Sequence, residues 1–248
     1  MAEETLEQRV QRLEKLVQRS LDFEEIQNVM ARHAFLDAQG KNREQVEEIF
    51  SHTMPDVSFA VHNNHVYKGL DTIIHYYCDN WEQRMRPEQL KTLRKIFPDI
   101  KDIKENEMAG WMKMHTCCTP YIIVAGDGKT AKGTWESPGF VTGPMGGRIP
   151  ALWMWERYAI DFVKENGKWM IWHFNGMIQF MTPYDKSWVS AAVEPVAAVE
   201  VVDTAPKVSI TFNKAYSPKE LCGPLTPDFP PQPVPYQTFS ETFSYGQP

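Results

Sequence analysis

Five side chains in this sequence are of the types that move protons: His33, His115, His173, Glu136 and Glu156. An imidazole gains and loses a proton near neutral pH, so each histidine can serve as a general acid or base. A carboxylate among apolar neighbours is poorly solvated, which raises its pKa toward the range useful for catalysis. We take these five as the candidate catalytic residues.

The segment 153–158 reads Trp-Met-Trp-Glu-Arg-Tyr and alternates in character along the chain, as a strand does. Glu156 therefore shares one face with Met154 and Tyr158. If that face lines a pocket, the carboxylate lies between a thioether and a phenol. The alternative is that Glu156 pairs with an arginine at a subunit interface. Glu136, which follows Trp135 on the preceding expected strand, has the same two interpretations.

Each histidine also has a purely structural interpretation. His115 lies on an expected strand, where a buried imidazole can simply bond to the backbone. His33 lies in an expected helix, where it could cap a neighbour or, if protonated, polarise a leaving hydroxyl or stabilise an oxyanion. His173 and Asn175 alternate with two aromatic residues, so only one of these two pairs faces inward.

Aromatic residues are the distinctive part of the composition, with 8 Trp, 9 Tyr and 13 Phe beside 12 Met. Rigid rings and flexible thioethers suit a core, and they equally suit a pocket for a flat apolar ligand. The side chains expected to hold such a ligand are Tyr67, Trp135, Met154, Tyr158, Trp172 and Asn175.

Charge and motifs exclude several classes of function. A net charge of −6 without a Lys/Arg cluster gives no basic surface for binding nucleic acid. We expect neither a signal peptide nor a membrane span. The four cysteines lack metal-type spacing, which favours reduced thiols in a cytoplasmic protein. No P-loop, Rossmann glycine pattern or nucleophile elbow is present, and His62 and His65 lack an evident third ligand. We expect neither a metal nor an organic cofactor.

Helical patterns come first in the chain and long strands follow. The expected helices cover 6–17, 22–39, 43–50 and 71–81, with a strand at 57–61, a hairpin turn at 63–69 and a polar insertion or lid at 85–108. The long strands are expected at 112–124, 130–138, 151–163 and 168–180. The narrow apolar stripe of the first helix predicts packing on the domain or on a partner subunit. This order predicts an α+β fold.

Composition divides the chain into three parts: an N-terminal helix at 1–20, an α+β domain at 21–190 and a Pro-rich tail at 191–248. Repeated prolines sustain neither helix nor sheet, so the tail is either an extended arm over a neighbouring surface or disordered. Its aromatic residues favour the arm.

Several short motifs resemble the SnoaL-like branch of the nuclear transport factor 2-like superfamily over roughly residues 21–188. They are the helix ending Arg32-His33-Ala34-Phe35-Leu36-Asp37-Ala38-Gln39-Gly40, the run Val66 to Ile73, Met114-His115 with 122–131, and 167–173 with Thr182-Pro183-Tyr184-Asp185 and Trp188. The resemblance implies a cone-shaped curved sheet wrapped around helices, a cystatin-like α+β barrel, with a pocket that works without metal or organic cofactor. It also implies that His115 is the pocket histidine and that His33 stands where relatives place a tyrosine.

Relatives in this branch include ketosteroid isomerase, scytalone dehydratase, polyketide cyclases and a diarylpropane lyase. The isomerase's aspartate would fall near Val61, which accepts no proton, so the resemblance favours a dehydratase-type lyase acting on a small aromatic or polycyclic hydroxylated substrate. Carbon–carbon cleavage through a quinone methide, an isomerase or cyclase reaction, and ligand binding without catalysis remain alternatives. A homodimer or higher homo-oligomer is expected, because the outer face of a bent sheet needs cover.

Overall fold

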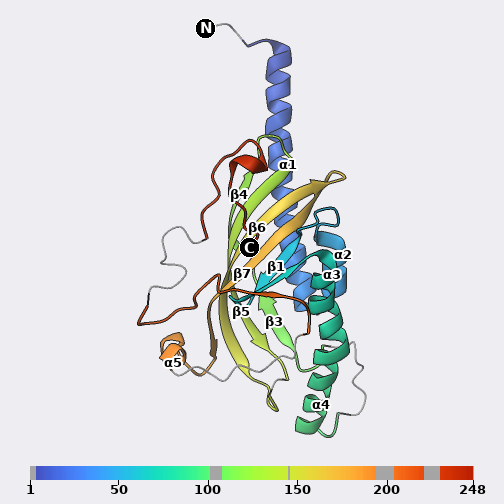
Figure 1. Ribbon diagram of the computed structural model, residues 1–248, viewed down its shortest axis with the longest axis vertical. Helices are drawn as coiled ribbons and strands as arrows, with labels where there is room; N and C mark the ends of the chain where they lie inside the picture. The colour runs from blue at the N-terminus through green and yellow to red at the C-terminus, as the bar shows by residue number, and fades with distance from the viewer. Residues whose placement is uncertain (1–3, 101–107, 145, 194–203, 221–229, 248) are drawn as a thin grey trace.

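The long first helix, α1 (Leu6–Ala38), organises the molecule (Figure 1). The computed structural model describes residues 4–100, 108–144, 146–193, 204–220 and 230–247, with side chains described up to 190 in the third range. Thr5 begins α1 with a capping box, in which its side chain accepts from the Gln8 amide and the Gln8 side chain accepts from the Thr5 amide. The two helices expected at 6–17 and 22–39 are therefore one helix, because no Gly or Pro interrupts them and Ser20 does not end it.

Shorter helices follow and lie along one side of the sheet (Figure 1). They are α2 (Asn42–Ile49), α3 (Leu70–Ile73), the π-helical segments η1 (Ile74–Asp79) and η2 (Trp81–Met85), and α4 (Arg86–Ile96). The polar region expected to be an insertion or lid begins with α4, whose Leu90 and Leu93 are buried, and residues 101–107 lie outside the described residues.

The strands form one curved sheet in the order β3-β5-β6-β7-β1-β2-β8, with β4 also paired to β5. Their bounds are β1 (Ser58–Val61), β2 (His65–Lys68), β3 (Met112–His115), β4 (Cys118–Val124), β5 (Thr130–Thr142), β6 (Ala151–Glu165), β7 (Lys168–Pro183) and β8 (Val208–Ser209). The β1–β7 pair is parallel, and the other named pairs are antiparallel. Register shifts at Trp155/Glu156 and Asp161/Phe162 mark bulges that bend the long strands.

Two sequence predictions about strands were wrong. The strand expected at 112–124 is split at Thr116 and Cys117 into β3 and β4, which pair with different halves of β5, and Thr119 near the start of β4 has a φ of 48°. The hairpin turn expected at 63–69 is shorter: His62 and Asn63 take positive φ angles, and β2 starts at His65. In the first place the chain keeps its direction along β5 and only the pairing is interrupted. In the second, side-chain pattern alone did not show where the chain reverses.

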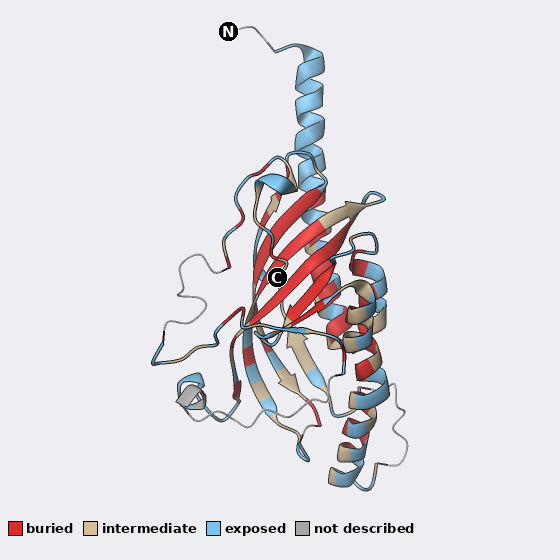
Figure 2. Cartoon of the chain, in the orientation of Figure 1, coloured by how far each residue is buried: buried red, intermediate tan, exposed pale blue. Residues whose placement is uncertain are grey.

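The concave face of the sheet packs on α1 and α2 and holds the main core (Figure 2). Its largest members include Ile26, Met30, Phe50, Phe162 and Trp169. These apolar side chains come from the strands and from one side of α1, which fixes how the helix lies in the cone. The structure is therefore α+β with a curved, unclosed sheet.

The convex face is covered in part by the C-terminal tail (Figure 1). Phe212 and Tyr245 pack with the outward side chains Ala60, Ala159 and Met177. Backbone hydrogen bonds also tie the tail to the β4–β5 turn, with the Gly126 and Asp127 amides donating to tail carbonyls at 2.9 and 3.1 Å. Where it is described, the Pro-rich tail is thus an arm that packs on its own domain, and Thr204 at its start bonds to His75 and Arg84.

Candidate active site

His115 ends β3 on the concave side, between two buried carboxylates. Its Nδ1 lies 3.0 Å from Glu156 Oε2, and its Nε2 lies 3.9 Å from Asp37 Oδ2. The side chains of His115, Glu156 and Asp37 are only 13, 13 and 10% exposed. Three elements, β3, β6 and α1, therefore bring a potential base and two anions together inside the fold.

Gly139 on β5 makes this arrangement possible. It is the register partner of His115 on one side and of Met154 on the other. A Cβ at position 139 would lie 2.2 Å from the Met114 carbonyl oxygen, so a larger residue would push β3 away. The absent side chain lets β3 pass close to β5 and deliver the imidazole.

Hydrogen bonds to Glu156 set the tautomer of His115. The Tyr158 hydroxyl and the imidazole both reach Glu156 Oε2 at 3.0 Å. A carboxylate oxygen accepts, so Nδ1 carries the proton and the lone pair of a neutral His115 is on Nε2. Nε2 therefore faces Asp37 Oδ2 at 3.9 Å with a lone pair that can accept a proton, as a general base requires.

The pKa of Glu156 differs from the sequence expectation. Burial raises the pKa of this carboxyl, as predicted, but the hydrogen bond and charge of His115 and the hydroxyl of Tyr158 outweigh burial and lower it below its ordinary value. Burial correspondingly lowers the pKa of His115, but the bond to Glu156 and the charges of Glu156 and Asp37 raise it overall. Glu156 is thus an anion that makes His115 more basic, rather than an acid.

Asp37 was missed in the sequence analysis. Its Oδ1 accepts from the Tyr77 hydroxyl at 2.7 Å and from the Lys113 ammonium at 2.9 Å. Burial raises the pKa of Asp37, yet Lys113 and the nearby imidazoles lower it well below its usual range. Its Oδ2 is buried and has no hydrogen-bond partner in the described part of the chain. An ionised oxygen therefore faces His115 with an unused acceptor site.

The sequence spacing of Asp37 and Lys113 could have placed them beside the predicted histidines. Asp37 follows His33 by four residues on a helix, and Lys113 precedes His115 by two on a strand, so each pair shares a face. Tyr77 carried no comparable signal, because its position depends on how η1 packs against α1.

His33 borders the same cluster and is 4% exposed. Its ring packs against Tyr158 and Phe174 at centroid distances of 5.7 and 4.8 Å, and its Nδ1 lies 2.5 Å from the Gln45 amide nitrogen. Burial is the main cause that lowers the pKa of His33 to about 4. The protonated form considered from the sequence is therefore a minor species at neutral pH. The neutral ring packs beside the cluster and bonds to Gln45.

The predicted aromatic side chains divide between this site and the core. Tyr158 belongs to the cluster, and Met154 lies on the same face of β6. Tyr67 is fully buried and stacks on Tyr76 at 3.8 Å, while Trp135 is 2% exposed and packs edge-on against Phe162 at 5.9 Å. The last two rings thus meet core neighbours, and contact of any of the four with a ligand stays a prediction.

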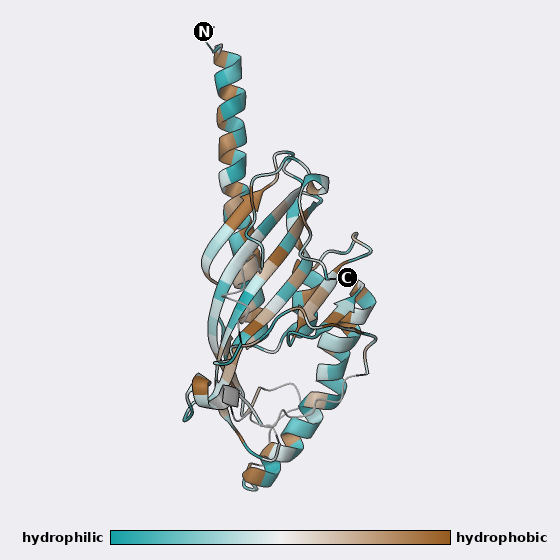
Figure 3. Ribbon diagram, turned by 60° about the vertical axis from the view of Figure 1, so that its left-hand side comes forward, coloured by the Kyte–Doolittle hydropathy of each residue, from teal (hydrophilic) through white to brown (hydrophobic). Residues whose placement is uncertain are grey.

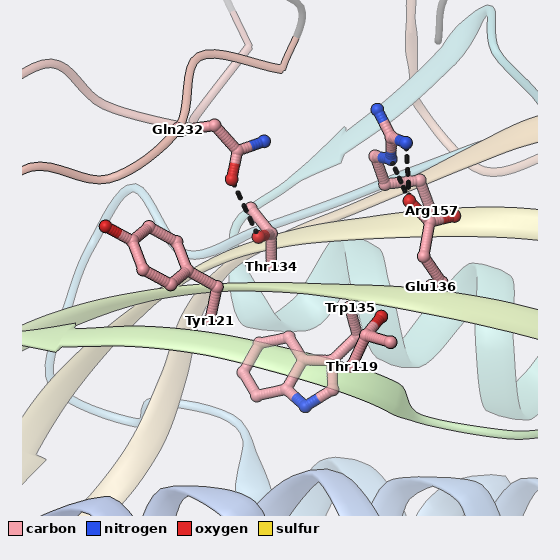
Figure 4. A pocket seen from close by; sticks show the side chains of 7 residues that line it. All are labelled: Thr119, Tyr121, Thr134, Trp135, Glu136, Arg157 and Gln232. Atoms are coloured by element: carbon pink, nitrogen blue, oxygen red, sulfur yellow. Dashed lines mark hydrogen bonds and ion pairs between the residues drawn. The ribbon is translucent and has the colours of Figure 1, made fainter.

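Four predicted site residues lie on the convex face instead. Glu136 accepts from Arg157 at 2.8 Å and from the Trp155 indole at 2.9 Å, so the Glu–Arg pair considered for Glu156 is formed by Glu136. Beside it is a shallow pocket of about 140 Å³, lined also by Tyr121, Thr134 and Gln232 of the arm (Figure 4).

His173, Trp172 and Asn175 lie under the C-terminal arm. His173 Nδ1 bonds to Asp161 at 2.8 Å, and Asp161 also pairs with Lys132 at 2.5 Å. The Ser244 hydroxyl reaches the same Nδ1 at 3.2 Å, so serine and aspartate compete for one nitrogen and no relay to a nucleophile exists. Strand alternation places His173 and Asn175 opposite the inward ring of Phe174. Trp172 has no register partner at the bulge opposite Asp161 and Phe162, and it contacts Phe239 of the tail at 4.4 Å.

Asn175 is 2% exposed, and its side-chain oxygen has no partner among the described residues. The structure thus joins His115, Glu156, His33 and Tyr158 and separates them from His173, Glu136, Trp172 and Asn175. In the described part of the chain, no three His, Cys, Asp or Glu side chains are placed to hold a metal ion. Nor does any described helix combine the length and apolarity that a membrane span needs.

The model of the SnoaL-like domain matches residues 18–175. The chain belongs to the SnoaL-like family. The match begins inside α1 and ends in β7, so the SnoaL-like chain has a projecting helix and a tail outside it. No curated protein matches its sequence.

Several solved structures are similar to the SnoaL-like chain at low sequence identity. One is a nuclear transport factor 2-like protein with a cystatin-like fold from Novosphingobium aromaticivorans, with 17% identity, a TM-score of 0.43, and coverage of 75% of this chain and 94% of that one. A hexachlorocyclohexane dehydrochlorinase, LinA type 2, has 13% identity, a TM-score of 0.46 and coverage of 71% and 95%. A nuclear transport factor 2-like superfamily protein from Salmonella enterica has 14% identity, a TM-score of 0.44, and coverage of 68% of this chain and 99% of that one.

Proposed function

We propose that this SnoaL-like protein is a lyase that removes water from a small aromatic or polycyclic hydroxylated substrate by general acid/base catalysis. The proposal rests on one observation: His115 Nδ1 is held by Glu156 at 3.0 Å while Nε2 faces the free oxygen of Asp37 at 3.9 Å. An imidazole that a carboxylate orients through Nδ1, so that the basic lone pair is on Nε2 in a buried setting, suits proton abstraction from carbon.

In the proposed reaction, His115 Nε2 takes a proton from a substrate carbon. The electron pair of the broken C–H bond forms a new C=C bond, and the neighbouring C–O bond breaks. Asp37 and Glu156, both anionic, stabilise the imidazolium that forms, because opposite charges attract strongly in a poorly solvated site. The two carboxylates therefore make His115 a stronger base, because they stabilise the positive charge that it gains with the proton.

The departing hydroxide needs a proton to leave as water. Two cations lie in the cluster: the imidazolium just formed and the Lys113 ammonium, which is 12% exposed and bonded to Asp37. Tyr158 is a poor proton donor, because burial raises its pKa well above its ordinary value. We assign the proton return to His115, with Lys113 stabilising the departing oxygen.

The test is turnover by the His115→Ala variant. Purified protein is screened against hydroxylated aromatic and polycyclic compounds, and loss of water is followed by mass spectrometry and by absorbance of the new double bond. Removing the general base should lower kcat by about 10²–10⁴-fold with ligand affinity retained. The control is His75→Ala, which removes an exposed imidazole.

Unchanged turnover by His115→Ala would overturn the proposal. If compounds bind to the wild type but none is turned over, the protein is a ligand-binding member of the family and the lyase proposal fails. An isomer or ring-closed product without loss of water would assign the same base to an isomerase or cyclase.

A further inference from the structure

The first half of α1 stands clear of the rest of the molecule (Figures 1 and 2). All residues from 4 to 21 are exposed, among them Leu6, Leu13 and Val17 at 77, 51 and 58%. Of the two partners expected from the sequence, the chain's own domain therefore does not cover this apolar stripe. Apolar side chains in a row on a projecting helix cost solvation free energy unless another surface buries them.

The stripe has the spacing of a coiled-coil seam. Leu6, Val10, Leu13 and Val17 are separated by four, three and four residues, which places the leucines at d positions and the valines at a positions of a heptad. Among parallel coiled coils, a β-branched residue at a with leucine at d favours two helices. The seam residues thus favour a pair of helices.

The seam points away from the domain. The helix turns about 100° per residue, so the seam lies roughly opposite the side on which Asp22, Ile26 and His33 are buried against the sheet. The brown bands on the projecting part of the helix in Figure 3 belong to this uncovered region. A second helix can therefore approach without meeting the domain that carries the first.

The flanking residues distinguish parallel from antiparallel pairing. In a parallel pair each g residue faces the e residue five positions later on the other chain. That places Arg9 beside Glu14 of the second copy, and Leu16 beside Leu21 of the second copy, each pair occurring twice. An antiparallel pair aligned on the same seam would place Glu7 beside Glu14, which repel. Charge complementarity favours the parallel arrangement.

We propose that α1 of two copies of this chain forms a parallel two-stranded coiled coil through Leu6, Val10, Leu13 and Val17. A peptide of this length is marginal as an isolated helix. Here the second half of α1 is already packed in the domain, and the capping box fixes the other end, so the helix is preformed when it meets its partner. The active-site residues take no part, so this inference stands apart from the proposed function.

The first test is sedimentation velocity of the full chain over a range of concentrations. The wild type should dimerise, and Leu13→Glu should raise the dimer dissociation constant by about 100-fold or more, since it places two charges in the seam. Gln11→Glu adds the same charge on the other side of the helix and should sediment as the wild type. A monomeric wild type, or Leu13→Glu that behaves like Gln11→Glu, would overturn the proposal.

Crosslinking tests the direction even if a second interface also joins the chains. In a parallel pair the two Leu13 residues face each other, so Leu13→Cys should form a covalent dimer under mild oxidation well above the level of the wild type. Gln11→Cys should not. Equal crosslinking at the two positions would refute the parallel seam.

Charge exchange gives a further check. Arg9→Glu turns two attractive contacts into repulsive ones and should weaken the dimer roughly fivefold to tenfold. Adding Glu14→Arg to it restores opposite charges and should restore the affinity. Failure of this rescue would exclude the assigned e and g positions.

Discussion

The neutral state of buried His33 has a measurable consequence for stability. Burial lowers the pKa of His33 from 6.5 to about 4, so the unfolded chain binds this proton more readily than the folded protein does. The contribution of neutral His33 to the free energy of unfolding is therefore complete above pH 6.5 and is lost as pH falls toward 4. From these two pKa values, folding loses about 2 kcal/mol by pH 5 and about 3 kcal/mol by pH 4.

The variant His33→Gln isolates this effect, because glutamine keeps an acceptor near the Gln45 amide and does not titrate. Urea denaturation from pH 7.5 to 5 gives the free energy of unfolding of each protein. The other titrating groups are common to both proteins. As pH falls from 7.5 to 5, the free energy of unfolding of the wild type should therefore decrease by about 2 kcal/mol more than that of the variant.

His75→Gln, which removes an exposed imidazole, is the matched control, and its pH profile should run parallel to that of the wild type. A wild-type minus His33→Gln difference that stays constant across the range would refute the reasoning. It would mean that His33 takes up a proton in the folded protein without penalty.

Further predictions concern the charged networks on the two faces of the sheet. Glu156→Gln removes the main cause that raises the pKa of His115, so the acidic limb of kcat/KM against pH should move to lower pH while the maximum falls; an unmoved limb would contradict the assignment of His115 as base. Asp37→Asn removes the anion facing Nε2 and should lower kcat by about tenfold or more with KM little changed, and a rise in KM alone would show a binding role instead. Asp161→Asn leaves the fully buried Lys132 ammonium without its anion and should cost roughly 3–5 kcal/mol in urea denaturation; a loss below about 1 kcal/mol would contradict the buried pair.

The protein uses buried charge differently on the two faces of its sheet. On the convex face, Asp161 accepts from Lys132, from His173 and from the Tyr245 amide at 2.7 Å, so its acceptor sites are filled by the fold and by the arm. On the concave face, Asp37 keeps one oxygen without a partner. A filled network fixes structure, whereas the acceptor without a partner beside His115 is the oxygen on which the proposed function depends.

Local patterns in the sequence were enough for the class of fold and for several inward positions. The α+β order followed from helical periodicity before strand alternation, and the family resemblance to 21–188 agrees with the match to residues 18–175. Alternation correctly grouped Glu156 with Tyr158 on one face of β6, because successive side chains of a strand point to opposite sides whatever the rest of the chain does.

Tertiary packing decided which face was inside and what charge each group carries. The pattern around His173 is as alternating as that around Glu156, yet His173 lies on the convex side, where Ser244 of the C-terminal arm contacts it. The pKa of Glu156 depends on His115, which is 41 residues away in the chain, and the role of Asp37 depends on Lys113, at a separation of 76. Sequence determines local period and composition, but charge and orientation depend on neighbours that only folding brings together, because electrostatic interactions act through space.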